Sequence, residues 1–277
     1  MRLEAALATA RERLRRAPFR PVPREATLLL GHVLDLGEAR VLARLDDELP
    51  QQAERRFFEL LERRLAGEPV AYLTGEREFY GREFVVDRRA LIPRPETEHL
   101  VEAALARQLP AAPCLLEIGC GSGCIAVTLA LELPTSRIVA TDISPGALAL
   151  TATNARRYGV TKRLALVGTD LVAGVDLTRF DLVISNPPYV GDHERSELSP
   201  EILEFEPERA LLGGGARGLD LIDRMLRELR AAPSGVPVLL EVGAGQAEAL
   251  EDTARFELRE TIADYAGIPR VVVLRRT

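Results

Sequence analysis

The sequence contains little aromatic, sulfur-bearing or imidazole chemistry. It has no tryptophan, and aromatic residues make up 5% of its 277 residues. Its cysteines, Cys114, Cys120 and Cys124, are odd in number and form no Cys-x-x-Cys pair. This pattern argues against a disulfide or zinc framework and is typical of reduced thiols. Because its three histidines are scattered along the chain, we expect no metal site.

Long apolar runs are also absent. None approaches the roughly 20 residues that a membrane-spanning helix needs. The N-terminal stretch carries an acid, Glu4, and lacks the apolar block and cleavage site of a secretory signal. We therefore expect a cytoplasmic protein with no membrane contact.

The sequence has no excess of positive charge. Its formal net charge is −6 and its pI is about 5.4. Up to Glu78 the acidic and basic residues are equal in number, so the remainder carries the whole net charge. A domain that neutralises many phosphates is strongly basic. The balance of charge therefore favours partners other than nucleic acid.

Apolar spacing divides the chain into three parts. Residues 1–75 are predicted to form a helical domain, because apolar residues recur at helical intervals. Residues 76–95 predict a connector that contains a hairpin around Gly81. Residues 96–277 alternate short apolar strands with helices, which is typical of an α/β fold with a parallel sheet. The helices expected in the first part cover Leu3–Leu14, Arg24–Val33 and Gln51–Leu65; the seven expected strands are Cys114–Ile118, Arg137–Thr141, Leu164–Gly168, Phe180–Ser185, Pro237–Val242, Phe256–Glu260 and Arg270–Leu274.

The first expected strand runs into a glycine-rich loop, which comprises Gly119, Cys120, Gly121, Ser122 and Gly123. Glycines at alternate positions allow a tight turn and a close approach of the backbone to a ligand. The spacing differs from the G-x-G-x-x-G fingerprint of dinucleotide sites. An acid, Glu117, precedes the loop and suits a cation such as a sulfonium or an ammonium better than a pyrophosphate.

Acidic residues follow the next two strands. Asp142 ends the second strand, where a carboxylate can accept both hydroxyls of an adenosine ribose. Its alternative role is that of a helix N-cap for residues 144–156. Asp170 and Leu171 end the third strand and are expected to flank the adenine.

The fourth strand delivers Asn186, Pro187, Pro188 and Tyr189 to the same edge of the sheet. The two prolines fix φ and remove two backbone donors, so that the loop presents oxygens. The Asn186 side-chain oxygen and the Pro187 carbonyl can accept both hydrogens of a planar NH₂ group, and Tyr189 offers it an aromatic face. An amide nitrogen is a poor nucleophile because its lone pair is delocalised. Two acceptors would stabilise the positive charge that develops on this nitrogen and aim it at a methyl donor.

These stretches together resemble the HemK/PrmC-type family of release factor glutamine methyltransferases. The Asn-Pro-Pro-Tyr tetrapeptide alone is shared with DNA and RNA amino-methyltransferases, whereas its combination with Leu91–Glu98 and a helical N-terminal domain is more specific. The resemblance covers nearly the whole chain and rests on Pro69–Gly75, Phe79–Gly81, Leu91–Glu98, the glycine loop, Asn186–Tyr189 and Ala210–Gly214.

The resemblance implies a class I, Rossmann-like methyltransferase fold with a seven-stranded, mostly parallel sheet. It implies transfer of a methyl group from S-adenosylmethionine to the side-chain amide N5 of the glutamine in the Gly-Gly-Gln motif of peptide chain release factors. The product of the cofactor would be S-adenosylhomocysteine. The helical domain would dock the release factor, and we expect a monomer.

By position, the resemblance assigns the cofactor to Gly119–Gly123 and Asp142, with Leu171 beside the adenine and Arg94–Glu98 as a cover. Asn186 would touch both cofactor and substrate, and Asn186–Tyr189 would hold the glutamine amide. The family often has an aromatic residue at the position of Leu171, where this chain has an aliphatic one.

Three alternatives stay open from sequence. The same loop chemistry serves methylation of adenine N6 or a guanine amino group, although such enzymes call for a basic recognition region. A glutamine in a ribosomal protein is a closer alternative. A non-enzymatic adenosyl-binding module would leave the NH₂-holding loop without a purpose.

Overall fold

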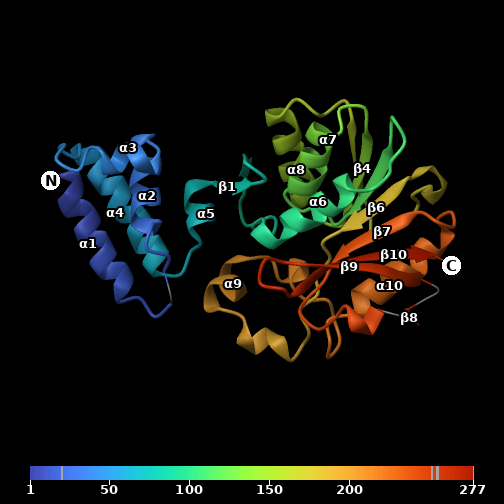
Figure 1. Cartoon of the computed structure of the whole chain (residues 1–277). Coiled ribbons are helices and arrows are strands. Elements are labelled where there is room, and N and C mark those ends of the chain that lie inside the picture. Colours follow the sequence, from blue (N-terminus) through green and yellow to red (C-terminus); the bar gives the residue numbers. More distant parts are fainter. Residues whose placement is uncertain (20, 251, 254–255, 277) are drawn as a thin grey trace. The chain divides into compact units, whose positions relative to one another are not determined.

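The computed structural model describes residues 1–19, 21–250, 252–253 and 256–276. The chain forms two compact units, seen in Figure 1 with helices near the N-terminus in blue and the sheet in green to red. The first unit comprises Met1–Glu76 together with Ser199–Phe205, and the second comprises Arg77–Leu198 and Glu206–Thr277. The predicted catalytic domain ends at Thr277, which lies outside the described residues. Within the described part, none of the helices has the length and apolar character to cross a bilayer.

The first unit is a helical bundle around its own apolar core. Leu7, Leu30, Phe57 and Leu61 are among the fully buried residues of this core. The three predicted helices are present within one or two residues, and the five-residue α3 and α5 are additional. Its helices are α1 (Leu3–Arg15), α2 (Glu25–Leu34), α3 (Glu38–Leu42), α4 (Gln51–Leu65) and α5 (Val70–Thr74), with α9 (Pro200–Phe205) contributed from far along the chain.

A short hairpin opens the second unit. Strands β1 (Glu76–Phe79) and β2 (Arg82–Val85) pair across a two-residue turn at Tyr80 and Gly81. Both turn residues have positive φ, 52° and 69°, as in the tight turns that match the twist of paired strands. The predicted hairpin around Gly81 is confirmed.

A twisted sheet forms the centre of the second unit, with the order β5-β4-β3-β6-β7-β10-β9-β8. The five strands from β5 to β7 run parallel, and the last three pair antiparallel. The seven predicted strands and the Rossmann-like architecture are confirmed, with the two-residue β8 added at the edge. The strands are β3 (Cys114–Ile118), β4 (Arg137–Asp142), β5 (Leu164–Gly168), β6 (Leu182–Ser185), β7 (Pro237–Glu241), β8 (Asp252–Thr253), β9 (Phe256–Ala263) and β10 (Pro269–Arg276).

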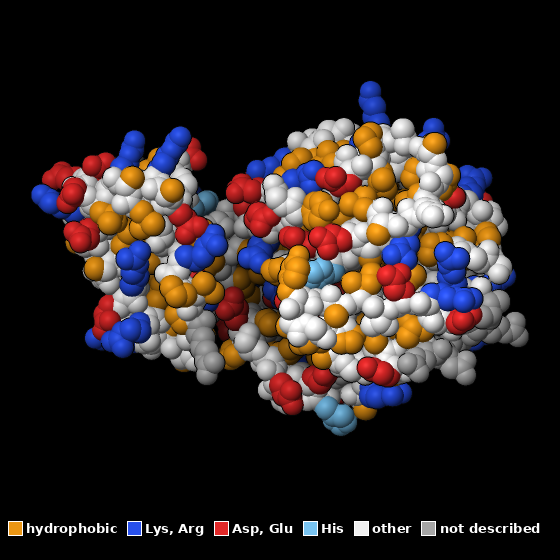
Figure 2. Space-filling view, in the orientation of Figure 1, with side chains coloured by type: hydrophobic (Ala, Val, Ile, Leu, Met, Phe, Trp, Pro, Cys, Tyr) orange, Lys and Arg blue, Asp and Glu red, His pale blue; other side chains and the backbone are white. Residues whose placement is uncertain are grey.

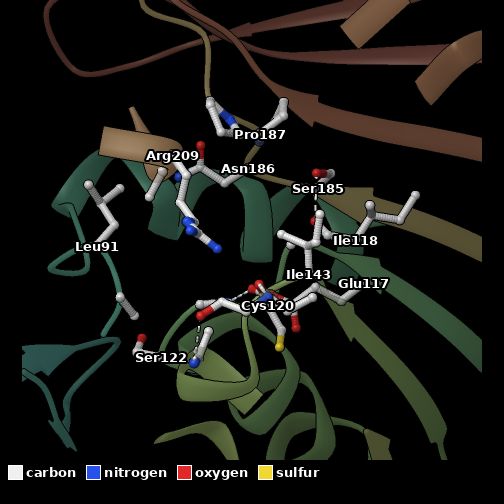
Figure 3. A pocket seen from close by; sticks show the side chains of 18 of the residues that line it. Leu91, Glu117, Ile118, Cys120, Ser122, Ile143, Ser185, Asn186, Pro187 and Arg209 are labelled. Atoms are coloured by element: carbon white, nitrogen blue, oxygen red, sulfur yellow. Dashed lines mark hydrogen bonds between the residues drawn. The ribbon is translucent and has the colours of Figure 1, made fainter. Parts of the chain in front are cut away.

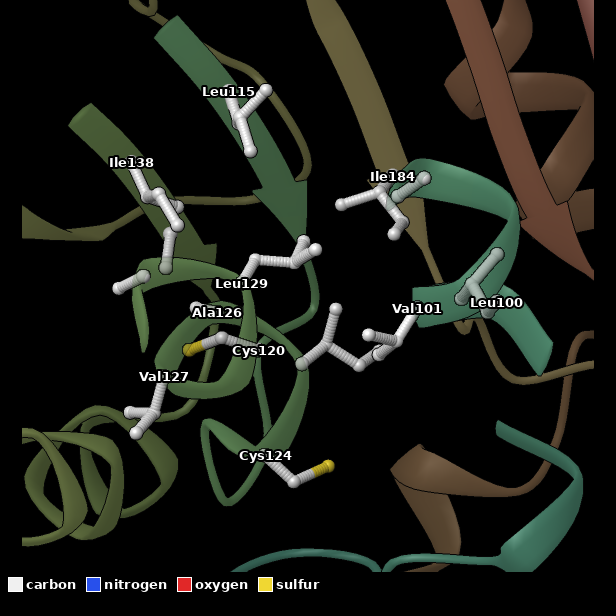
Figure 4. Packing of buried hydrophobic residues seen from close by; sticks show 14 of the residues in the cluster. Leu100, Val101, Leu115, Cys120, Cys124, Ala126, Val127, Leu129, Ile138 and Ile184 are labelled. Atoms are coloured by element: carbon white, nitrogen blue, oxygen red, sulfur yellow. The ribbon is translucent and has the colours of Figure 1, made fainter. Parts of the chain in front are cut away.

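The sheet separates two apolar cores. Successive residues of a strand face opposite sides, so Leu115 belongs to one core and Leu116 to the other. Helices α6 (Glu98–Leu105), α7 (Cys124–Glu132) and α8 (Pro145–Arg157) cover the first core, and α10 (Asp220–Glu228) covers the second. Figure 4 shows Leu100 of α6 and Leu129 of α7 beside the strands. Burial on both faces explains why the central strands are almost continuously apolar.

Candidate active site

A cavity of about 420 Å³ lies at the carboxyl ends of the parallel strands, within the second unit. Its size falls in the usual range of small-molecule sites. The polar residues that follow β3, β4, β5 and β6 converge there, as the shared edge of a parallel sheet requires. Of the predicted cover Arg94–Glu98, Arg94 and Thr97 line the cavity, whereas Gly123 and Tyr189 of the predicted site do not. The other predicted site residues all line it, namely Glu117, Gly119, Cys120, Gly121, Ser122, Asp142, Asp170, Leu171, Asn186, Pro187 and Pro188.

The glycine loop connects β3 to α7 through three residues of positive φ, Gly119, Gly121 and Gly123. The backbone N–H groups of Gly119 and Cys120 both donate to the Thr141 carbonyl at 2.9 Å. Gly123 lies outside the cavity, at the start of α7, where an added Cβ would meet the Thr151 side chain at 2.6 Å. The glycines therefore allow a bend that no ordinary side chain would tolerate.

Glu117 is the most unusual charged group in the cavity wall. Glu117 is 1% exposed, and neither of its carboxyl oxygens has a hydrogen-bond partner of normal geometry among the described residues. Burial, with a smaller contribution from the Asp142 charge and against the nearby Ala126 backbone N–H, holds the pKa of the Glu117 carboxyl well above its usual range. A cation placed beside it would favour the ionised form. The site is therefore complementary to a positively charged ligand group.

Asp142 joins the glycine loop to the start of α8. Its carboxylate accepts hydrogen bonds from the backbone N–H of Gly121 at 3.0 Å and of Ser144 at 2.8 Å. The N-cap of α8 is Ser144, whose hydroxyl accepts from Ala147, so the alternative capping role does not fall to Asp142. A carboxylate has lone pairs for about four hydrogen bonds, which leaves capacity for two ribose hydroxyls.

The far wall of the cavity is apolar with one ion pair. Leu171 has a positive φ of 50° and lines the cavity together with Leu221 and Met225. Asp170 forms an ion pair with Arg224 of α10. An aliphatic surface thus stands where the family often has an aromatic ring. The expected contacts of Asp170 and Leu171 with adenine stay predictions.

The loop after β6 presents Asn186 to the cavity in a defined orientation. Its side-chain Nδ2 donates to the Thr97 hydroxyl at 3.0 Å. No described residue donates to the opposite atom, Oδ1. Figure 3 shows Asn186 and Pro187 across the cavity from Cys120 and Ser122. The Asn186 side chain therefore presents its oxygen, a hydrogen-bond acceptor, to the cavity. If the amide group were rotated by 180°, it would present its NH₂ donors instead.

The backbone of this loop is held by residues that sequence reasoning did not single out. Gln246 Nε2 donates to the carbonyl of Tyr189 at 2.8 Å and of Arg217 at 2.7 Å, and its Oε1 accepts from Gly243. Val190 exchanges backbone hydrogen bonds with Leu211 and Gly213, within the predicted Ala210–Gly214 motif. The sequence did give one signal, since Gln246 closely follows an expected strand at the same sheet edge.

Tyr189 is turned away from the cavity and packs in the second core. Burial raises the pKa of its hydroxyl to about 12, with the Glu241 charge as a further cause. The expected stacking of its ring on a planar amide therefore has no direct support from the cavity wall and stays a prediction.

The connector and the segment after α9 close the other side of the cavity. Glu206 is buried, accepts from the Ile92 backbone N–H at 3.0 Å and forms an ion pair with Arg94. Arg209, which the sequence did not indicate, extends from the short turn Glu208–Ala210 into the cavity (Figure 3). A guanidinium in this position suits a carboxylate.

Two family models match the chain. Residues 5–75 match the model described as PrmC N-terminal domain, and residues 98–217 match the one described as methyltransferase small domain. A release factor glutamine methyltransferase of Cereibacter sphaeroides is 42% identical over 99% of this chain and 94% of its own length. Another from Koribacter versatilis is 40% identical over 92% of each chain.

Solved structures share the fold. A methyltransferase from Pyrococcus furiosus superposes with a TM-score of 0.52 at 16% sequence identity, over 77% of this chain and 95% of its own. At this level of identity the likeness concerns the fold alone.

Proposed function

The chain belongs to the family of release factor glutamine methyltransferases, and we propose that it methylates the side-chain amide N5 of the Gly-Gly-Gln glutamine in a peptide chain release factor. The observation that carries this proposal is the orientation of Asn186. With its Nδ2 bonded to Thr97, it offers an oxygen acceptor to the cavity, as an NH₂-bearing substrate requires.

The residues present fit S-adenosylmethionine as the methyl donor, which when bound supplies a methyl group on a positively charged sulfur. The unpartnered Glu117 carboxyl is complementary to the positive charge of its methionine part, and Arg209 to its carboxylate. Asp142 has free lone pairs for the ribose hydroxyls. Leu171 and Met225 provide an apolar surface for adenine.

The substrate amide is activated by the Asn186 loop. Oδ1 of Asn186 and the carbonyl of Pro187 accept its two hydrogens, which stabilises the positive charge that develops on nitrogen as its lone pair is used. The same two contacts fix its direction of approach. The nitrogen can lose a proton after the new bond has formed, so no strong base is needed beforehand. No metal is needed either, because the sulfonium is already an activated electrophile.

The helical unit is the proposed docking surface for the release factor. In Figure 2 acidic and basic side chains are interspersed over its visible face, and the chain up to Glu78 has no net charge. Such a surface suits a protein partner better than a polyanion. We further propose that the enzyme acts as a cytoplasmic monomer that contacts no nucleic acid directly.

A comparison of acceptors tests the substrate. Purified enzyme with tritiated S-adenosylmethionine is expected to label a bacterial release factor and to leave duplex DNA and ribosomal proteins unlabelled. A release factor whose motif glutamine is replaced by glutamate is the matched control, because it keeps the shape and lacks the NH₂ group. Labelling of DNA or of a ribosomal protein in preference to the release factor would overturn the assignment.

A further inference from the structure

Beneath the Asn186 loop lies a buried polar cluster, which consists of Thr97, Tyr189 and Glu241. Thr97 is 2% exposed and Glu241 is 1% exposed. Glu241 ends β7, which lies beside β6 in the sheet and brings its carboxyl group under the loop. The Thr97 and Tyr189 side chains lie near enough to this carboxyl to lower its pKa, while its Oε2 has no hydrogen-bond partner of normal geometry among the described residues.

The direction of the hydrogen bonds in this cluster follows from counting protons. Asn186 Nδ2 donates to Thr97 Oγ1 at 3.0 Å. The Thr97 hydroxyl has one proton and can donate one hydrogen bond. An ionised carboxylate can only accept hydrogen bonds. If Thr97 gives its proton to ionised Glu241, the chain of donors from Asn186 through Thr97 to Glu241 has a fixed direction.

We propose that ionised Glu241 is a positioning residue, which acts through Thr97 to hold Asn186 with its oxygen toward the substrate amide. The proposal rests on the function inferred above. If Glu241 were neutral, it could donate to Thr97, and Thr97 could then donate to the Asn186 oxygen. The Asn186 amide would turn over and present its NH₂ group to the NH₂ group of the substrate, which would remove one of the two acceptors.

The surroundings of Glu241 place this switch near neutral pH. Burial raises the pKa of its carboxyl to about 7, and the charge of Glu96 also raises it. The neighbouring Thr97 and Tyr189 hydroxyls and the charge of Arg270 act in the opposite direction. Since the ionised fraction increases with pH, the productive orientation of Asn186 is favoured above about pH 7 and lost below it.

The sequence offers an unusually clean probe of this orientation. Asn154 and Asn186 are its two asparagines, so protein labelled with nitrogen-15 at asparagine shows two side-chain amides. Asn154 is an internal control, because it bonds to backbone groups of Val85 and Ser122. In the free wild-type enzyme the Asn186 amide resonances are expected to shift with an apparent pKa near 7, while those of Asn154 stay still.

Substitutions identify the titrating group. Glu241→Gln and Thr97→Val should each abolish the Asn186 shift, whereas Thr97→Ser, which keeps the hydroxyl, should retain it. Glu117→Gln should also retain it, because the Glu117 carboxyl makes no hydrogen bond to Asn186, Thr97 or Glu241 and is not part of the chain of donors. A shift that persists in Glu241→Gln, or that disappears in Glu117→Gln, would overturn the proposal.

Kinetics give the second readout. At saturating substrate and cofactor, kcat of the wild type should rise with pH through about 7. Glu241→Gln should remove this rise and lower kcat at high pH by about tenfold or more, the scale of one lost hydrogen bond to a developing charge. The KM for S-adenosylmethionine should change little. Thr97→Ser should restore most of the activity that Thr97→Val loses, and equal activities of these two variants would contradict the relay.

Different results would refute the proposed function and the positioning role of Glu241. If the wild-type enzyme does not methylate a release factor, the proposed function is wrong, and the resonance titration still tests the orientation of Asn186. If the enzyme methylates the release factor but the Asn186 amide does not titrate, the positioning role of Glu241 is wrong and the function stands.

Discussion

At the scale of single residues, the site depends on polar atoms that are buried with unequal numbers of partners. Asn186 has its amide nitrogen occupied by Thr97 and its oxygen available. Neither oxygen of Glu117 has a hydrogen-bond partner of normal geometry among the described residues, which is costly for a buried carboxylate. Such unsatisfied groups lower the stability of the free protein and become favourable when a ligand of matching charge binds.

Glu117→Gln separates these two effects. We expect the affinity for S-adenosylmethionine to fall by about 10- to 150-fold, the equivalent of about 1.5–3 kcal/mol for a hydrogen bond to a charged group. The raised pKa of Glu117 means that the free wild-type protein loses stability as the pH rises from 4.5 through that pKa, because the unfolded carboxyl ionises first. The variant should lack this loss. Titration calorimetry and thermal unfolding at several pH values measure both, and unchanged affinity would exclude Glu117 from the cofactor site.

Which of these residues the sequence revealed depends on whether a local signal marks them. Glu117, Asp142 and Asn186 each lie at the end of an apolar strand, so their convergence could be predicted from the edge rule for parallel sheets. Thr97 stood within the stretch expected to cover the cofactor, but its bond to Asn186 joins segments far apart in the chain. Arg209 lies after α9 and follows no strand, so no periodic pattern pointed to it.

At the scale of elements, the loop Asn186–Tyr189 is kept in place by close backbone packing. The segments around Gly213 and Gly218 approach it so closely that an added Cβ at Gly218 would lie 2.0 Å from the Tyr189 carbonyl oxygen. The helices and strands themselves could be predicted, because their apolar periodicity is regular. The packing of one loop against another could not be predicted, because a glycine in the sequence does not show which distant segment packs closely against it.

Gly218→Ala should therefore disturb the loop more than the fold. Gly267→Ala is the matched control, because Gly267 also has positive φ but open space around the added Cβ. Backbone strain should lower the free energy of unfolding of both variants by about 1–2 kcal/mol. Gly218→Ala should in addition lower kcat by about a hundredfold, as expected when reacting groups are displaced by about 1 Å. Unfolding curves measure the loss of stability, and steady-state kinetics measure kcat. Equal kcat values for the two variants would show that the contact does not position the loop.

At the scale of the whole molecule, the first unit is completed by residues 199–205 from far along the chain. Glu201 of this segment and Glu25 of α2 both form ion pairs with Arg64, which is 2% exposed and lies against the Phe19 ring. The sequence predicted a helical domain from the first 75 residues but not this addition. An ion pair between distant residues leaves no periodic trace in either segment.

Arg64→Met should destabilise the first unit by about 3–5 kcal/mol, because it leaves two carboxylates without their buried partner. Arg13→Ala is the control, since its ion pair with Glu62 is solvent-exposed and should contribute no more than about 1 kcal/mol. Cofactor affinity should be unchanged in both, because the cavity is lined by the second unit, whereas release factor methylation should fall in Arg64→Met. Denaturant unfolding and calorimetry test this, and a loss of cofactor affinity in Arg64→Met would contradict the separation.

We infer that the oxygens of the Asn186 loop hold a glutamine amide for methylation. Mass spectrometry of a release factor tests this inference, after incubation with S-adenosylmethionine and either wild-type enzyme or Asn186→Ala. We expect the wild type to add one methyl group at the side-chain nitrogen of the Gly-Gly-Gln glutamine, and the variant to bind cofactor yet add none. Methylation at another residue, or near-normal transfer by Asn186→Ala, would contradict the account.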